Sequence, residues 1–154
     1  MILFQQELMS IGRFLYDNNK VKLYFDDVPE ELQVPSMFFP IPELMPTIDS
    51  TSTFRCNYTM YVKIFEKTKQ EAMTKANELA YKILKNKLKV PVVMEDGTVT
   101  KENIKLNNIQ PRGVDDMAAQ LAISWSSTSM FSSDENISGE KIEKLIIQPF
   151  LREG

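Results

Sequence analysis

The sequence contains no histidine, and it has one cysteine and five glycines among 154 residues. Without histidine, the chain lacks the commonest general base and the commonest transition-metal ligand, which excludes histidine-based catalytic triads and zinc sites. The single cysteine, Cys56, can form neither an intramolecular disulfide nor a cysteine-based zinc site. The glycines stand singly, so no glycine-rich loop can hold phosphate groups. These absences remove most sequence signatures of enzymes and nucleotide-binding proteins.

Acidic pairs are the remaining candidates for a metal site, and they occur at Asp26-Asp27, Glu30-Glu31 and Asp115-Asp116. Carboxylates bind Mg²⁺ or Ca²⁺ through their oxygens. However, adjacent residues on a strand point to opposite faces, and three separated pairs do not define one site. We therefore expect solvated loop acids, with no metal, no cofactor and no catalytic residues.

The charge balance is mildly acidic, with a net charge of −3. Nucleic-acid binding depends on concentrated Lys and Arg, so this balance does not favour specific nucleic-acid partners. No apolar run approaches the roughly 20 residues that span a bilayer, and no signal peptide is evident, so no membrane partner is expected. Hydrophobic residues make up 43% of the chain, which suits one folded domain. We expect it in the cytoplasm or in a particle assembled there.

The clearest pattern is a strand that runs almost directly into a helix, between Phe54 and Asn86. The strand alternates between two faces, and the face expected to point inward consists of Phe54, Cys56, Tyr58, Met60, Val62 and Ile64. The apolar residues that follow have helical spacing, and they are Ala72, Ala76, Leu79, Ala80 and Ile83. Thr68 and Glu71 form a capping signature, which places the helix start near Thr68.

Further segments complete an α+β domain. Residues 4–16 have the spacing of a first helix, residues 21–25 and 34–39 predict short strands, and residues 121–125 predict the last strand. Asp96-Gly97 predicts a hairpin turn between strands at 90–94 and 98–101. Residues 106–109 are expected to pair next, and the regular pattern breaks at 110–117, which contains Pro111 and Gly113.

The predicted fold is one mainly antiparallel sheet with two helices packed on one face, plus a β-hairpin insertion and a C-terminal extension. A polar run follows the last predicted strand, and a second one begins at Ser132. We therefore expect the α+β domain to span residues 1–131 and the extension to span residues 132–154.

Two peripheral segments are more apolar than a solvated segment usually is. The first covers residues 35–46 and contains four prolines, which predicts an edge strand leading into an extended arm. The second lies within residues 139–154. Each could pack over the core or contact a partner. The candidate protein-contact residues are Met37, Phe38, Phe39, Ile41, Leu44, Met45, Ile142, Leu145, Ile146 and Phe150.

The order of these elements carries a family resemblance. It consists of a helix at 4–16, a strand at 21–25, the strand Val34-Pro35-Ser36-Met37-Phe38-Phe39, the long strand at 54–65, a helix and a last strand. This order resembles the tail terminator proteins of long-tailed phages. The resemblance covers residues 1–131 as an architecture and includes no diagnostic motif. The hairpin and the C-terminal extension depart from the family's minimal pattern.

The resemblance implies a structural protein without catalytic residues. Such a subunit forms a ring, commonly hexameric, on the head-proximal end of the tail tube, stops tube growth and offers a surface for head joining. The implied partners are further copies of the chain, the tail tube protein and the head–tail connector protein. The implied location is the virion, after assembly in the host cytoplasm.

Three alternatives remain open at this stage. The chain could be another phage neck, connector or minor tail subunit. It could instead be a small-molecule-binding regulatory α+β module, which needs a concave pocket with convergent polar groups. A metal-dependent enzyme that uses Asp and Glu alone is the third alternative.

Overall fold

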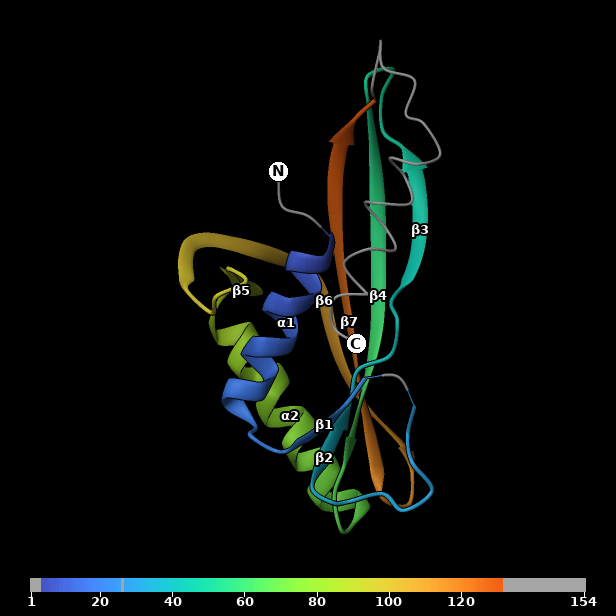
Figure 1. Ribbon diagram of the computed structural model, residues 1–154. Coiled ribbons are helices and arrows are strands. Elements are labelled where there is room, and N and C mark those ends of the chain that lie inside the picture. The colour runs from blue at the N-terminus through green and yellow to red at the C-terminus, as the bar shows by residue number, and fades with distance from the viewer. Residues whose placement is uncertain (1–3, 26, 132–154) are drawn as a thin grey trace.

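The computed structural model describes residues 4–25 and 27–131. The elements of this part of the chain, drawn in Figure 1, are α1 (Phe4–Asn18), β1 (Lys22–Tyr24), β2 (Ser36–Phe38), β3 (Glu43–Ile48), β4 (Thr53–Phe65), α2 (Lys69–Lys85), β5 (Lys89–Val93), β6 (Val99–Asp115) and β7 (Ala118–Met130).

The strands form one sheet in the order β1-β2-β4-β7-β6-β5, and β3 pairs with β4 beside this path. The β1–β2 pair is parallel, and the other pairs are antiparallel. β2 pairs with the end of β4 near Phe65, whereas β3 pairs with the end near Phe54. Both helices lie on one side of the sheet (Figure 1). The predicted fold class, α+β with a mainly antiparallel sheet and two helices on one face, is confirmed.

The long strand β4 supplies the centre of the core. Its predicted inward face is buried from Tyr58 to Ile64, while Phe54 and Cys56 are half-buried. β4 pairs with β7 along its whole length, with Tyr58 opposite Trp125 and Val62 opposite Leu121. Because cross-strand partners share a face, the buried residues of the two strands form one continuous apolar surface.

Helix α2 covers that surface with the face expected from the sequence. Its buried residues are Ala72, Ala76, Leu79, Ala80 and Ile83. Thr68 is the N-cap, and its hydroxyl accepts a hydrogen bond of 3.2 Å from the Glu71 amide. This bond satisfies an amide that has no partner within the helix, as the capping signature predicts.

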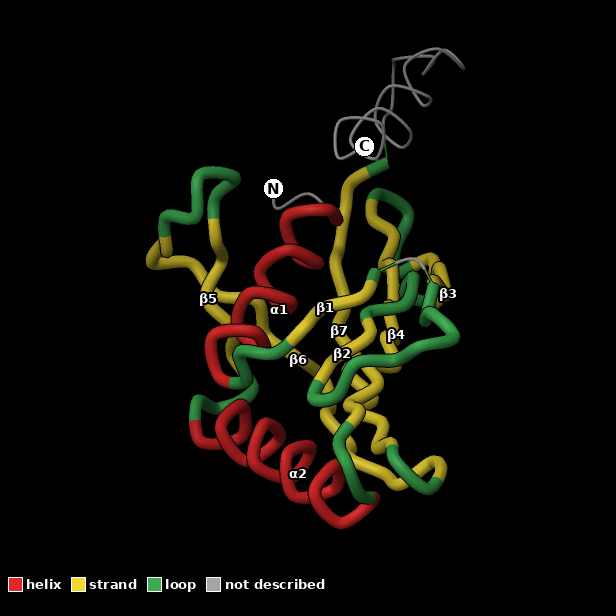
Figure 2. The backbone as a smooth tube through the Cα atoms, turned by 60° about the horizontal axis from the view of Figure 1, so that its bottom comes forward, coloured by secondary structure: helices red, strands yellow, loops and turns green. Residues whose placement is uncertain are grey.

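Helix α1 packs beside β5 at the other end of the helical layer (Figure 2). Ile11 and Leu15 are buried on its inner face. The Ser10 hydroxyl donates to the Gln6 carbonyl (2.7 Å) and accepts a bond of 2.9 Å from the Val93 amide. This second bond fixes the predicted hairpin to the helix. The hairpin turn itself is confirmed, with Gly97 at a φ of 90°, a conformation that favours glycine.

The expected break at 110–117 is wrong, because β6 continues to Asp115 through Pro111 and Gly113. The first part of β6 pairs with β5 and the second part pairs with β7. Among the described residues, the second part therefore has a neighbouring strand on one side only. A proline on such an edge removes no necessary ladder hydrogen bond, so the strand tolerates Pro111.

The last strand is longer than the sequence indicates. Instead of ending at Trp125, β7 continues to Met130, and Ser126 to Ser129 pair with residues 54–57 of β4. Polar residues can continue a strand where backbone pairing holds it and no core faces it. The expected boundary between a domain at 1–131 and an extension at 132–154 stays a prediction, because the extension lies outside the described residues.

Candidate assembly surface

The proline-rich segment predicted at 35–46 divides between the core and the surface. Its first part contains β2, where Met37 is fully buried, Phe38 is half-buried and Phe39 is buried just after the strand. The Phe39 amide donates to the Tyr24 carbonyl (2.9 Å), and the Phe39 ring stacks on Phe25 at 5.7 Å. The apolar area of Met37 and Phe39 is therefore used within the subunit.

The second part of this segment is exposed. Ile41 keeps 88% of its surface, Met45 71% and Leu44 54%, and Ile48, just beyond the predicted segment, keeps 76%. We call these four residues the β3 strip. Three predicted contact residues are thus brought together here, and Ile48 joins them.

The strand β3 that carries most of this strip is an edge strand. Among residues 4–25 and 27–131, it pairs with β4 alone, from Glu43 opposite Thr59 to Ile48 opposite Phe54. An exposed edge strand with apolar side chains presents backbone donors and acceptors as well as apolar area, which makes it a template for contact with another chain. All six residues of β3 are exposed.

The β3 strip has side chains on both faces of the sheet. Leu44 lies opposite Tyr58 and Ile48 lies opposite Phe54, so both share the face that carries the core further along β4. Met45 lies opposite Asn57 on the other face. A partner that engages the whole strip must therefore reach around the edge of the sheet.

A polar link holds this edge strand in place. The Asn57 side-chain amide donates to the Met45 carbonyl and to the Thr47 hydroxyl, both at 3.2 Å. The Asn57 carbonyl oxygen accepts a bond of 2.7 Å from Ser126 on β7. One side chain of β4 thus connects the strands on either side of it.

The apolar surface continues from Ile48 to the end of β7. The Phe54 and Phe131 rings lie 5.3 Å apart, and the Phe131 amide donates to the Ser52 carbonyl (2.9 Å). Met130 is exposed beside them. The predicted contact residues Ile142, Leu145, Ile146 and Phe150 lie outside the described residues, in the segment that follows this point.

A buried acid lies where α1 meets the sheet. The Glu7 side chain is 5% exposed, and its carboxylate accepts a bond of 2.8 Å from the Trp125 indole nitrogen. The Tyr58 ring stacks on Trp125 at 5.3 Å. Burial raises the pKa of the Glu7 carboxyl, while its hydrogen bonds to Trp125 and Ser127 oppose the rise. Burial also raises the pKa of Tyr58. This cluster orients α1 on the sheet.

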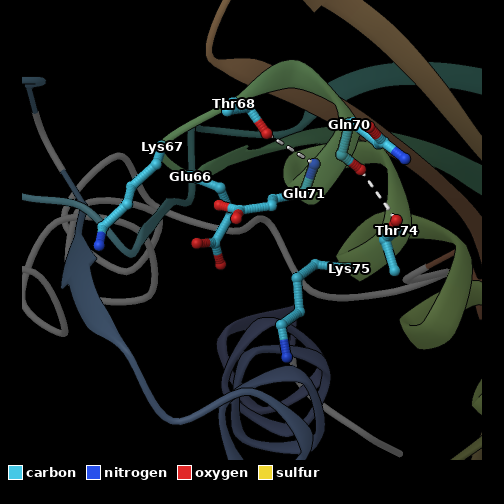
Figure 3. A pocket seen from close by; sticks show the side chains of 7 residues that line it. All are labelled: Glu66, Lys67, Thr68, Gln70, Glu71, Thr74 and Lys75. Atoms are coloured by element: carbon cyan, nitrogen blue, oxygen red, sulfur yellow. Dashed lines mark hydrogen bonds between the residues drawn. The ribbon is translucent and has the colours of Figure 1, made fainter.

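The start of α2 borders a groove of about 760 Å³ that is lined by polar and charged side chains (Figure 3). Glu66 and Glu71 lie there with Lys67 and Lys75. Burial raises the pKa of the Glu66 carboxyl, Lys75 opposes this effect, and repulsion from Glu71 adds to it.

A second hollow, of about 340 Å³ on the opposite sheet face, is lined mostly by amide and hydroxyl side chains. Neither is lined mainly by the hydrophobic and aromatic residues that are typical of small-molecule sites.

Other site types were sought in the same part of the chain. Within residues 4–25 and 27–131, no three Cys, Asp or Glu side chains are grouped so that they could hold a metal ion. No helix in these ranges is long and apolar enough to cross a membrane.

Sequence reasoning overlooked Ile48, Met130, Phe131 and Glu7. Ile48 follows Leu44 and Pro46 at a spacing of two, a signal that becomes clear once residues 43–48 are recognised as a strand. Glu7 offered a weaker signal, because an acid in the first turn of a helix usually serves the helix dipole in solvent.

The chain was compared with known protein families, proteins and structures. No family model matches it. It is 30% identical over 130 residues to the uncharacterized protein YqbJ of Bacillus subtilis (strain 168), covering 84% of this chain and 89% of that protein. It is 32% identical over 129 residues to the phage-like element PBSX protein XkdJ of the same organism, covering 84% of this chain and 88% of XkdJ.

Among solved structures, the chain is similar to a chain in the virion of a native gene transfer agent particle. The TM-score is 0.47 and the identity 10%, with 80% of this chain and 94% of that chain covered.

Proposed function

The chain belongs to the family of YqbJ and the phage-like element PBSX protein XkdJ, and we propose that it is a structural protein of a phage or phage-like particle. The observation that carries this proposal is the match to XkdJ, at 32% identity over 129 residues and 84% of the chain. The described residues contain an edge strand with exposed apolar side chains, which is in keeping with assembly.

Within this class, we propose the role of tail terminator. Its support is the order of elements that resembles that family, together with the exposed β3 strip. A subunit that forms a ring needs apolar surface left over after its own core is complete. The β3 strip is such a surface, since Ile41, Met45 and Ile48 remain exposed while the core beneath α1 and α2 is filled. The ring would cap the head-proximal end of the tail tube and present a surface to the head–tail connector.

The terminator role can be separated from its nearest alternative by deleting the gene. A terminator stops tube growth, so its loss gives tubes of uncontrolled length without heads. Loss of a connector or other neck subunit leaves tubes of normal length without heads. Electron microscopy of particles from the deletion strain measures tube length. Long headless tubes, with normal length restored by a plasmid copy, support the terminator role, and headless tubes of normal length contradict it.

The location of the protein follows the same proposal. We place it in the virion, after assembly in the host cytoplasm. Gold-labelled antibody against an epitope tag should decorate purified particles at the head–tail junction. Particles that remain unlabelled while the free protein is labelled would contradict a virion role.

The small-molecule alternative has less support in the structure. The two hollows described above are lined by polar side chains, including Gln70 and Thr74 in one and Asn108 and Gln110 in the other. A regulatory ligand site normally encloses its ligand in apolar side chains with a few polar contacts.

A further inference from the structure

The β3 strip is exposed apolar surface, and the sequence beyond Phe131 contains a second group of apolar residues. Residues 132–141 are mostly polar, and the ten residues after them carry most of the remaining apolar side chains. These are Ile142, Leu145, Ile146, Ile147, Phe150 and Leu151. We call residues 142–154 the C-terminal segment. It lies outside the described residues.

The starting point of the C-terminal segment lies beside the strip. The Phe131 ring lies 5.3 Å from the Phe54 ring at an angle of 45°, and Phe54 is the β4 partner of Ile48. β7 runs in the same direction as β3, since both are antiparallel to β4. β7 therefore ends at the same end of the sheet as β3, with Met130 opposite Thr53 and Ile48 opposite Phe54.

Residues 132–141 join Phe131 to the C-terminal segment. Residues 132–141 make ten residues, which span up to about 33 Å when extended. That reach exceeds the length of β3 itself, since six residues of strand measure about 20 Å.

We propose that the C-terminal segment of one subunit binds the β3 strip of the next copy of this chain. This inference rests on the proposed function, because it names the contact that joins neighbours in the ring. Donor and acceptor are different surfaces, so a head-to-tail contact is heterologous, and it generates a ring where the rotation between neighbouring copies closes. Direct pairing of two β3 edges would instead be isologous and would stop at a dimer.

The exposed surfaces fit this exchange. Among the described residues β3 pairs on one edge only, with Met45 on one face and Leu44 and Ile48 on the other, so a bound chain can bury side chains on both faces. Asn57 holds β3 in position from the sheet side, which keeps the acceptor preformed.

The test uses two full-length variants that each lose one half of the contact. Met45→Glu with Ile48→Glu disables the acceptor, and Ile146→Glu with Phe150→Glu disables the donor. A matched control, Tyr81→Glu with Val99→Glu, places the same charges at exposed apolar residues elsewhere. Light scattering after size exclusion, with native mass spectrometry, measures self-association of each protein and of a 1:1 mixture of the two variants.

The wild type and the control should form oligomers. Each contact variant alone should associate at least about 30-fold more weakly, because charges replace two central apolar anchors. The mixture should form a heterodimer, since one variant keeps its acceptor and the other keeps its donor, and growth should stop there.

A mixture that stays monomeric overturns the proposed contact between the C-terminal segment and the β3 strip. If the wild type still forms oligomers in that case, the ring and the terminator role survive on another contact. If all proteins are monomeric and β3 amides exchange faster with deuterium in the Ile146→Glu, Phe150→Glu variant than in the wild type, the segment covers its own strand, which also overturns the proposal. The terminator role itself is judged separately, by tube length in the gene deletion.

Discussion

The two ends of the sheet are built from the same strands but are stabilised differently. At the covered end, Tyr58 to Phe65 of β4 lie under the helical layer, and the inward side chains are buried. At the open end, Thr53 to Asn57 continue the same alternation beyond the helices (Figure 1). There the strands depend on backbone pairing and on side-chain hydrogen bonds such as those of Asn57.

The position of the helices, and not the strand pattern, decides where apolar surface is left exposed for assembly. Alternating residues produce an apolar face at both ends. Only the covered end uses that face within the subunit, so the open end retains Ile48 and Leu44 as exposed apolar area. The proposed ring contact lies at the end of the sheet that no helix covers among the described residues.

The largest expected effect is at the covered end, for Trp125→Ala. Trp125 is fully buried, and its indole donates to Glu7. Removing it leaves a cavity and takes a donor from a buried carboxylate, so the free energy of unfolding should fall by about 3–5 kcal/mol. Urea unfolding measures the change.

The matched substitution at the open end is Ile48→Ala. Because Ile48 is exposed in the isolated subunit, the free energy of monomer unfolding should change by less than about 0.5 kcal/mol. Equal losses of unfolding free energy for Trp125→Ala and Ile48→Ala would show that the two ends are equally packed, which would contradict the difference between them.

For Glu7→Gln we expect a change in the free energy of unfolding that depends on pH. Burial raises the pKa of Glu7 above its ordinary 4.5 in the folded state. Between the unfolded and the folded pKa, the unfolded chain releases this proton while the folded chain keeps it, so wild-type stability falls as pH rises through that window. The glutamine keeps an oxygen for the Trp125 indole and does not titrate.

Urea unfolding at a series of pH values measures this difference. The free energies of unfolding of the variant and the wild type should be most similar at acidic pH. As pH rises, the variant should become more stable relative to the wild type, with no further change above the folded pKa of Glu7. Glu102→Gln, on the exposed part of β6, is the control and should show no such trend. If the stabilities of the wild type and Glu7→Gln depend on pH in the same way, the raised pKa of Glu7 in the folded state is contradicted.

A modest global effect is expected for Asn57→Ala. It removes the hydrogen bonds that connect Asn57 to β3 and to Ser126, at a cost of roughly 0.5–1.5 kcal/mol. The sharper result is local, because the amides of β3 should exchange faster with deuterium while those of β7 near Trp125 do not change. Asn103→Ala, on exposed β6, is the control. Unchanged β3 exchange would mean that backbone pairing alone holds the edge.

The sequence predicted the covered end well and the open end poorly. Alternation in β4, helical spacing in α2 and the cap at Thr68 are local signals backed by burial, so they identify their elements directly. β3 and the end of β7 lack such signals, since Pro46 and the Ser126 to Ser129 run are poor strand formers that are held by pairing with β4. Pairing between distant segments is not visible in local composition.

The candidate surface was predicted in part for the same reason. Ile41, Leu44 and Met45 were recognised by apolar content among prolines, and the structure leaves them exposed. Met37 and Phe39 have the same composition but lie in the core, because β2 is inserted between β1 and β4. Composition identifies an apolar segment, whereas the sheet order decides which part of it meets solvent.

The central claim is that this chain ends tail tubes as a ring. The most direct measurement adds the purified protein to growing tail tubes of the same phage or phage-like element and records tube length and tip structure by cryo-electron microscopy. The account predicts that elongation stops and that ring density appears at one end of each tube. Tubes that lengthen at an unchanged rate, with both ends bare, would contradict it.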